Sequence, residues 1–241
     1  MKIKLLFLSV IMTVSSAFNA TTASAKNLHQ VDEDSQSGYA MYRTGKPNLR
    51  DFKEICALGI TQMIVLSGDA DKAELKYRDQ YCPQLEILYN EKQTVKVALT
   101  TGFLKQFDEW VKVAKEKGIK IAFRCDCGCH RTGRLAAYYE MKYMGASSDA
   151  AIRNMKALGK WMFLYPHLKN QVWALSNYIH GEPCSQSGKY CVTESLFTTA
   201  GSSSSYPEYE VATPYTAEDG INDPADQSDD GAQELQDVEA G

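Results

Sequence analysis

The stretch RCDCGCHRTG, residues 124 to 133, combines cysteines, a histidine and arginines with two glycines. Cys125 and Arg131 are separated by five residues, and Gly128 lies between them. A loop of this length can curl so that its backbone N–H groups point inward and form a nest for an anion. Gly128 permits the sharp turn because it has no Cβ atom, and the guanidinium of Arg131 matches two oxygens of a phosphate group. The spacing therefore indicates a loop that holds phosphate.

The residues on either side of this loop predict the elements that position it. IKIAFRC, 119 to 125, has the pattern of a buried strand, and TGRLAAYYEMKYMG, 132 to 145, is rich in helix formers. The loop then joins a strand end to a helix N-terminus, whose positive dipole end attracts anions. The same environment lowers the pKa of a thiol, which favours Cys125 as a nucleophile. Thr132 can place a hydroxyl near its sulfur.

The remaining pattern predicts short apolar strands that alternate with amphipathic helices. Such an order indicates the α/β class, with a central, mostly parallel sheet covered by helices on both faces. Ligands of these sheets bind at the carboxyl ends of the strands, where the loop lies. We expect strands at 61–68 and 84–89, a helix or turn at 69–80, and helices at 48–59, 100–118, 147–159 and 166–181.

The motif C-x-x-G-x-x-R-T-G after a strand resembles the signature of the protein tyrosine and dual-specificity phosphatases. The variant C-x-x-G-x-H-R-T-G is most similar to the atypical dual-specificity phosphatases of plants and fungi, some of which act on inositol pyrophosphates. The upstream YRTGKPN and LGITQMIVLSG are similar to segments of that branch, R-S-x-x-P and G-I-x-x-V-I-x-L. PTP-like phytases share the fold. The resemblance covers about residues 40 to 180 and implies a compact dual-specificity-phosphatase-like fold that hydrolyses phosphomonoesters without a metal or cofactor.

Carried over by position, the resemblance assigns roles within the loop. Cys125 would form a cysteinyl-phosphate, Arg131 would bind the phosphoryl oxygens, and Thr132 would ease the departure of the thiolate. The phosphate cradle would be completed by the backbone of Asp126, Cys127, Gly128, Cys129, His130 and Arg131.

The chain departs from the family pattern before and within the loop. Arg124 stands where the family usually has a histidine that helps to hold the thiolate. The family also uses an aspartate, roughly thirty residues before the cysteine, as the general acid, but no aspartate lies between Cys82 and Phe107. We therefore expect Glu91 to serve as the acid, with Asp69 or Asp71 as the next candidates. Cys127 and Cys129 are also unusual at their positions.

Three other functions fit the loop less well. Cys125, Cys127, Cys129 and His130 fit a zinc site poorly, because structural zinc sites pair two separated knuckles. A thiol-redox function is compatible with the closely spaced cysteines, since a neighbouring thiol could trap Cys125 reversibly. A catalytically weak phosphate-binding module would explain the missing aspartate.

The ends of the chain differ from its middle. Residues 1–25 combine Lys2 and Lys4 with an apolar run and end in Ala-Ser-Ala, which predicts a cleaved signal peptide. We expect a flexible arm at 26–40, a phosphatase domain at 41–192 and a disordered acidic tail at 193–241. The formal net charge is −4, but the tail contributes −12 and the signal peptide +2, so residues 26–192 carry +6. A basic domain favours anionic partners.

Export permits disulfides, and an odd total of seven cysteines leaves at least one unpaired. CSQSGKYC predicts a disulfide between Cys184 and Cys191, and a pair between Cys56 and Cys82 is also compatible with the sequence.

We expect a monomer in the periplasm or outside the cell, acting on a phosphorylated small molecule or a phosphoprotein, with no nucleic-acid partner and no stable membrane insertion after cleavage. A basic rim for a polyphosphate could come from Lys92, Lys96, Arg134, Lys156 and Lys160, although such side chains are more often simply solvated. The helical pattern predicts that Trp110, Trp161 and Trp173 belong to the core.

Overall fold

The computed structural model describes residues 25–194. The predicted signal peptide, apart from Ala25, and the predicted tail from residue 195 onward lie outside this range. The strands are β1 (His29–Asp34), β2 (Tyr39–Thr44), β3 (Gln62–Val65), β4 (Glu86–Asn90) and β5 (Lys120–Arg124). The helices are α1 (Leu49–Ala57), α2 (Glu74–Tyr81), α3 (Thr101–Lys117), α4 (His130–Tyr143), α5 (Ser148–Ala157) and α6 (His167–His180).

The five strands form one sheet in the order β1-β2-β5-β3-β4. The pairs β2–β5, β5–β3 and β3–β4 are parallel, and only β1–β2 is antiparallel. The predicted mostly parallel sheet is therefore confirmed, and β5 lies at its centre. A central strand is paired on both edges, so the loop that follows β5 starts from a fixed point.

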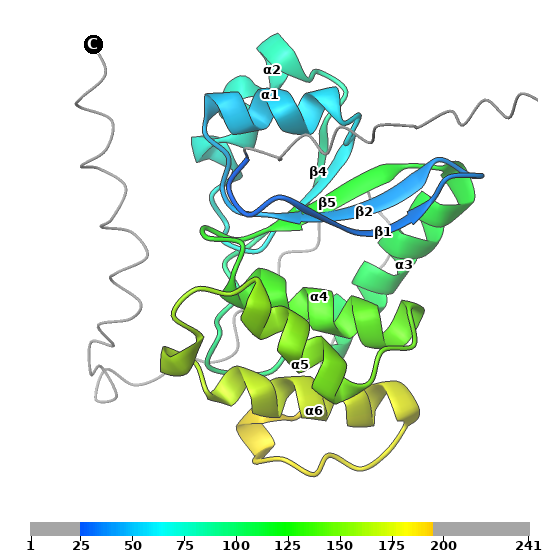
Figure 1. Ribbon diagram of the computed structural model, residues 1–241, viewed down its shortest axis with the longest axis vertical. Coiled ribbons are helices and arrows are strands. Elements are labelled where there is room, and N and C mark those ends of the chain that lie inside the picture. Colours follow the sequence, from blue (N-terminus) through cyan, green and yellow to red (C-terminus); the bar gives the residue numbers. More distant parts are fainter. Residues whose placement is uncertain (1–24, 195–241) are drawn as a thin grey trace, which may run out of the picture.

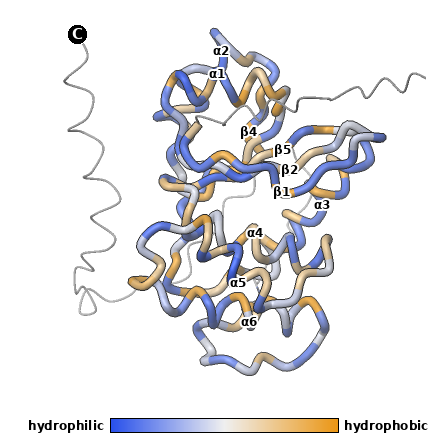
Figure 2. The backbone as a smooth tube through the Cα atoms, viewed as in Figure 1, coloured by the Kyte–Doolittle hydropathy of each residue, from blue (hydrophilic) through white to orange (hydrophobic). Residues whose placement is uncertain are grey.

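Helices cover both faces of the sheet, as predicted (Figure 1). The α1 and α2 side is filled by Phe52, Ile55, Ile60 and Met63 with other buried residues. The opposite side, which carries α3 to α6, has the larger cluster, centred on aromatic rings. There the fully buried Phe107 contacts the rings of Phe103, Phe123, Tyr138 and Tyr139. Figure 2 shows hydrophobic residues where the elements meet.

The helix boundaries follow local capping chemistry. Asn48 precedes α1 and forms a capping box with Asp51, which satisfies two amides at the start of the helix. The Thr100 hydroxyl accepts from the amide of Phe103 at the start of α3. Gly118 ends α3 in the left-handed conformation, with φ of 64°. These ends match the predicted starts and stops within two residues.

The flexible arm predicted for residues 26–40 is wrong, because this segment contains β1. Asp34 pairs with Tyr39, and His29 with Arg43, across an antiparallel ladder. The hydroxyl of Tyr139 also donates to the carboxylate of Asp32, at 2.5 Å. The strand is an edge strand whose side chains are half-buried or exposed, so it lacks the apolar alternation that identifies a strand in a sequence.

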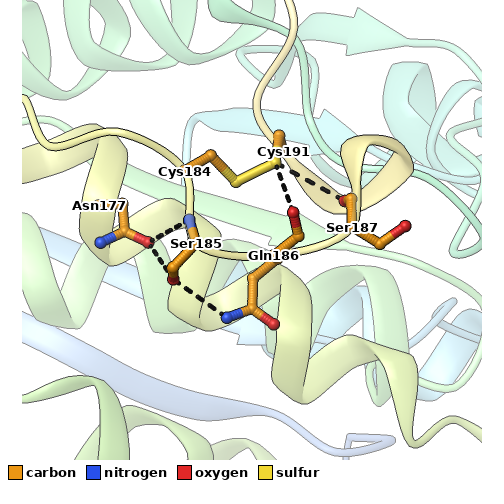
Figure 3. Close-up of a disulfide and its surroundings, with 6 residues drawn as sticks. All are labelled: Asn177, Cys184, Ser185, Gln186, Ser187 and Cys191. Carbon is orange, nitrogen blue, oxygen red and sulfur yellow. Dashed lines mark hydrogen bonds between the residues drawn. A yellow bond between two sulfur atoms is a disulfide. The ribbon is translucent and has the colours of Figure 1, made fainter.

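Two disulfides are present in the described part of the chain. Cys184 and Cys191 are bonded, as predicted, and Cys56 is bonded to Cys82. Figure 3 shows the first of these, with Ser185 hydrogen-bonded to the side chain of Asn177 on α6. The segment after α6 is thereby fastened to the helix. Of the helices within residues 25–194, none has the length and apolar character needed to cross a membrane.

Candidate active site

The structure places the loop of interest between β5 and α4, as the sequence predicts. Cys125 directly follows β5 and is buried, and α4 begins at His130, two residues earlier than the predicted start. Arg131 therefore lies in the first turn of α4. The nucleophile candidate and the guanidinium are thus held by a central strand and a helix N-terminus.

The turn of the loop packs directly on the end of β2. Gly128 has φ of 70°, and a Cβ atom there would lie 2.7 Å from Thr44 and from the amide of Gly45. A Cβ atom on Gly45 would in turn lie 3.0 Å from the backbone of Asp126 and Cys127. Gly128 is required both by this backbone contact and by its left-handed conformation, whereas a side chain on Gly45 would make the loop backbone shift slightly.

The carbonyl oxygens of the loop are held by donors from outside it. The amide of Lys46 donates to Asp126 O at 2.8 Å, and the side chain of Arg43 donates to Gly128 O at 2.7 Å. The side-chain amide of Asn27 donates to the carbonyl oxygens of residues 127 and 128 at 3.2 and 2.9 Å. Because C=O and N–H point in opposite directions across a trans peptide, the amides of residues 127–129 point away from these donors. This is the geometry of an anion nest. The amide of Cys129 donates to the sulfur of Cys127 at 3.1 Å.

Sequence reasoning did not assign a role to Asn27, Arg43 or Lys46. Arg43 and Lys46 lie in the YRTGKP segment, which is similar to a segment of the related phosphatases. That similarity could have identified both residues as partners of the loop. Asn27 falls in the segment predicted to be a flexible arm, and nothing in the sequence marks it.

A chain of alternating charges links the loop to the far side of the sheet. Arg131 contacts Asp126 at 3.3 Å, and Lys46 lies between Asp126 at 3.4 Å and Asp69 at 3.2 Å. Arg124 contacts Asp69 at 2.6 Å. The side chains of both arginines are therefore held in defined positions by carboxylates.

Arg124 faces away from the thiol rather than toward it. Its Nε donates to Glu74 Oε1 at 2.7 Å, and its Nη1 donates to the hydroxyl of Ser67 at 2.6 Å. Arg124 and Glu74 are both fully buried, so each neutralises a charge that would be costly alone. Arg124 thus secures α2 and the β3–α2 connection, which the histidine expected at this position would not do.

The thiol of Cys125 is coupled to that of Cys127. The hydrogen bond to Cys127, together with burial, raises the pKa of Cys125 above the ordinary value, so the lowering that the sequence predicts is wrong. Arg131 and the hydroxyl of Thr132 act in the opposite direction. Thr132 therefore lies beside the sulfur, where the sequence suggested it. Two thiols that share one site cannot both ionise easily, because the first thiolate raises the pKa of the second.

His130 connects the loop to the turn between α5 and α6. Its Nε2 lies 2.7 Å from the carbonyl oxygen of Lys160. Its ring packs on the ring of Tyr165, with 3.7 Å between centroids. The side chain thus contacts the flanking turn at two points and fixes that turn beside the phosphate loop.

Two of the three carboxylates considered for the acid, those of Glu91 and Asp69, differ in environment. Burial raises the pKa of Glu91, partly opposed by a hydrogen bond with Tyr89. Burial alone would also raise the pKa of Asp69, but Arg124, Ser67 and Lys46 together lower it to about 2. A general acid must hold its proton near neutral pH, so Glu91 suits the role better than Asp69.

Glu91 follows β4 at the carboxyl edge of the sheet. The next residues run beside the end of β3, where Lys92 bridges to Ser67 and the amide of Gln93 donates to Leu66 O. Leu66 in turn donates to the carbonyl of Arg124, immediately before the loop. The connection that carries Glu91 is therefore packed at the same edge as Cys125.

Arg134 does not belong to a basic rim, so that prediction is wrong. It is buried, and burial lowers its pKa to about 9. Its guanidinium donates to the carbonyl oxygens of Thr94 and Val97 and contacts Gln171. Gln171 donates to Val95 O. The two side chains hold the 93–97 segment in place, whereas Lys92, Lys96, Lys156 and Lys160 are exposed.

None of Cys125, Cys127 and Cys129 forms a disulfide. Within residues 25–194, no group of three or more His, Cys, Asp or Glu side chains is placed to hold a metal ion.

Neither a protein-family model nor a curated protein sequence matches this chain. Several solved structures are similar to it. TpbA of P. aeruginosa is 17% identical, with a TM-score of 0.46, and the match covers 64% of this chain and 91% of that one. The PP-IP phosphatase SIW14 of S. cerevisiae is 16% identical, with a TM-score of 0.46 and 60% and 85% covered. PTPMT1 in complex with PI(5)P is 11% identical, with a TM-score of 0.49 and 64% and 97% covered.

These similar structures belong to the class that the loop motif resembles, the tyrosine and dual-specificity phosphatases.

Substitution of Gly128 by alanine should abolish the anion nest. The added Cβ would collide with the backbone of Thr44 and Gly45, so the loop must move. We expect the variant to lose binding of tungstate, a tetrahedral stand-in for phosphate, as measured by isothermal titration calorimetry. Gly145→Ala is the matched control, because Gly145 has φ of 69° but no heavy atom within 4 Å of an added Cβ.

Both alanines are strained in the left-handed region, by about 1 to 2 kcal/mol each. Gly145→Ala should therefore lower the free energy of unfolding by about this amount and bind tungstate normally. Equal binding by the two variants would show that the contact of the loop with β2 does not shape the nest.

Substitution of Cys127 by alanine should make Cys125 more acidic. The change removes both the hydrogen bond and the neighbouring thiolate that raise the pKa of Cys125, while Arg131 and Thr132 still lower it. The rate of Cys125 alkylation by iodoacetamide, followed by peptide mass spectrometry, should reach its midpoint at a lower pH than in wild type. The control is Thr132→Val, which should shift the midpoint upward; an unchanged midpoint in Cys127→Ala would contradict the coupling.

Proposed function

We propose that this protein is a cysteine-dependent phosphatase of the dual-specificity type. The observation that supports this most directly is a set of hydrogen bonds to the carbonyl oxygens of the loop. Asn27, Arg43 and Lys46 donate them from outside the loop. These bonds leave the amides of residues 127–129 on the opposite side of the loop, and amides gathered on the inner side of such a loop are what binding of a phosphoryl group requires. Positioning and electrostatics supply most of the catalysis in such transfers.

In the proposed first step, the thiolate of Cys125 attacks phosphorus, and the bond from phosphorus to the leaving oxygen breaks. Arg131 and the amides of residues 126–131 bind the equatorial oxygens, where charge is spread. Glu91 gives its proton to the leaving oxygen. In the second step, the same carboxylate takes a proton from water, which attacks the cysteinyl-phosphate and releases phosphate and the thiolate.

Arg131 must exchange partners during this cycle. Its guanidinium contacts Asp126 at 3.3 Å, and Asp126 is shared with Lys46. A bound phosphoryl group would compete with Asp126 for Arg131, while Lys46 would keep Asp126 neutralised. This shared carboxylate keeps the guanidinium oriented without holding it so tightly that substrate cannot displace it.

The proposed substrate is a soluble phosphorylated small molecule, such as an inositol polyphosphate. The +6 charge of residues 26–192 favours a polyanion. Lys92, Lys96, Lys156 and Lys160 are exposed and could contribute to binding it. We also propose that residues 1–25 direct export to the periplasm or the medium, where phosphotyrosine proteins are scarce.

A second candidate is a catalytically weak phosphate-binding or thiol-redox module. The specific observation in its favour is the raised pKa of Cys125 beside Cys127, which leaves less of the nucleophilic thiolate at neutral pH. Phosphatase turnover separates the two functions.

The decisive test is phosphate release by the purified protein, wild type beside Cys125→Ser, in reductant and EDTA. Aryl phosphate, phosphotyrosine peptide and inositol hexakisphosphate form the substrate panel. We expect wild-type turnover that EDTA does not affect and a loss of about 1,000-fold or more in Cys125→Ser, because the hydroxyl is a far weaker nucleophile. Absence of turnover with a normally folded protein would favour the second candidate. If turnover is found, the preferred substrate identifies the substrate class of the enzyme.

Removal of the Glu91 carboxyl should slow the reaction in a way that depends on the leaving group. We expect Glu91→Gln to lower kcat about 100-fold for an alkyl phosphate, whose leaving oxygen needs a proton, and much less for p-nitrophenyl phosphate. Because the acid must be protonated, wild-type activity should fall at high pH, and Glu91→Gln should lose this alkaline limb. The matched control is Asp71→Asn. A leaving-group-dependent loss in the control instead would reassign the acid to Asp71.

A further inference from the structure

The turn between α5 and α6 exposes large apolar side chains. Trp161 is 67% exposed, Phe163 is 73% exposed and Leu164 is 47% exposed. The sequence-based prediction that Trp161 belongs to the core is therefore wrong, whereas Trp110 and Trp173 pack against the core. The apolar face of α5 does not extend to Trp161, because Trp161 lies after the end of the helix and adopts a left-handed conformation, with φ of 55°. In Figure 1 the turn projects from the side of the protein, beyond the end of α5.

The exposure is concentrated at one place. The other large apolar side chains exposed in the described range lie singly, on α1, on α2, before α3 and at the end of α4. Trp161 and Phe163, by contrast, contact each other with 6.0 Å between ring centroids. Contiguous exposed apolar groups of this kind mark interaction sites, whereas scattered ones need no explanation.

The surroundings of the turn are basic. From residue 150 to residue 181 the chain carries Arg153, Lys156, Lys160 and Lys169 and neither aspartate nor glutamate. Lys156 and Lys160 are exposed on either side of the aromatic residues in the sequence. Exposed aromatic rings flanked by lysines match the two components of an anionic bilayer surface, its apolar boundary and its charged headgroups.

A groove of about 670 Å³ adjoins the turn. Its lining is mixed: Met155, Met162 and Phe163 contribute apolar surface, and Lys156 and Lys169 contribute positive charge. A groove that combines apolar side chains with lysines again suits a lipid, which has an acyl chain and an anionic headgroup.

We propose that the α5–α6 turn, residues 159–165, docks the protein on anionic lipid bilayers. Trp161, Phe163 and Leu164 enter the boundary between headgroups and acyl chains, and Lys156 and Lys160 contact anionic headgroups. Because His130 of the phosphate loop holds Lys160 O and packs on Tyr165, docking brings the candidate active site to the membrane surface. This surface is independent of the proposed phosphatase activity, since none of its three apolar residues takes part in the reaction.

The test is co-sedimentation with vesicles of phosphatidylcholine alone or with 30% phosphatidylglycerol, using exported protein whose N-terminus is identified by mass spectrometry. Wild type should bind the phosphatidylglycerol vesicles at least about tenfold more than the neutral ones. Trp161→Ser/Phe163→Ser should lose about tenfold of that binding. The matched control is Leu75→Ser/Met144→Ser, which removes two apolar side chains that are 39% and 49% exposed elsewhere and should bind like wild type.

Two further arms locate the contact. Lys156→Gln/Lys160→Gln should lose the preference for phosphatidylglycerol. In Trp161→Phe, vesicle binding should persist, but quenching of tryptophan fluorescence by brominated acyl chains should fall to the level left by Trp110 and Trp173. Equal binding to both vesicle types, or equal losses in the two serine pairs, would overturn the proposal. So would absence of vesicle binding by folded wild type, in which case the turn would be a surface for a protein partner.

Discussion

The site depends on the close contact between the phosphate loop and the end of β2. Gly128 approaches Thr44 and Gly45 more closely than any side chain would allow, and the loop carbonyls are bound by donors from residues 27, 43 and 46. An anion nest has a cost, because its inward amides repel one another until an anion binds. Outward carbonyls with fixed partners offset that cost before any substrate arrives, so the loop is preorganised rather than shaped by its ligand.

The buried charges extend this preorganisation across the sheet. Arg124 lies directly before Cys125 and is neutralised by Glu74 and Asp69, while Asp69 shares Lys46 with Asp126. Removal of one partner from a buried pair typically costs about 3 to 5 kcal/mol, because a charge is left without compensation. The network is therefore a constraint on the backbone at both ends of the loop. It also explains why an arginine before the nucleophile is compatible with an intact loop: its charge is used structurally, away from the sulfur.

The fold could largely be predicted from the sequence, but several residues of the site could not. Apolar periodicity and capping residues locate β3, β4, β5 and the helices, because those elements have apolar residues at regular spacing. They do not locate β2, which pairs with β5 in parallel and is buried along its whole length. β1 escaped detection because an edge strand needs no such pattern. Asn27 and Glu74 contact the site only through tertiary structure, and no local signal distinguishes them from solvated residues. For Trp161, helical spacing predicts burial, but the residue adopts a left-handed conformation and is exposed. Arg134 is a candidate for a basic rim by its charge, but it is buried and donates to the carbonyl oxygens of Thr94 and Val97.

The phosphate loop and the exposed turn meet at His130. This residue belongs to the phosphate loop, and its side chain contacts Lys160 O and the ring of Tyr165 in the turn. A contact of this kind works in both directions, because any ligand that favours one arrangement of His130 also favours the matching arrangement of the turn. Burial of Trp161 and Phe163 in a bilayer would restrict the turn and, through Lys160 and Tyr165, the ring of His130. The amide of His130 belongs to the proposed phosphate cradle. Membrane docking and phosphate binding therefore act on one residue, which gives a physical route by which a lipid surface could change the affinity of the site as well as its location.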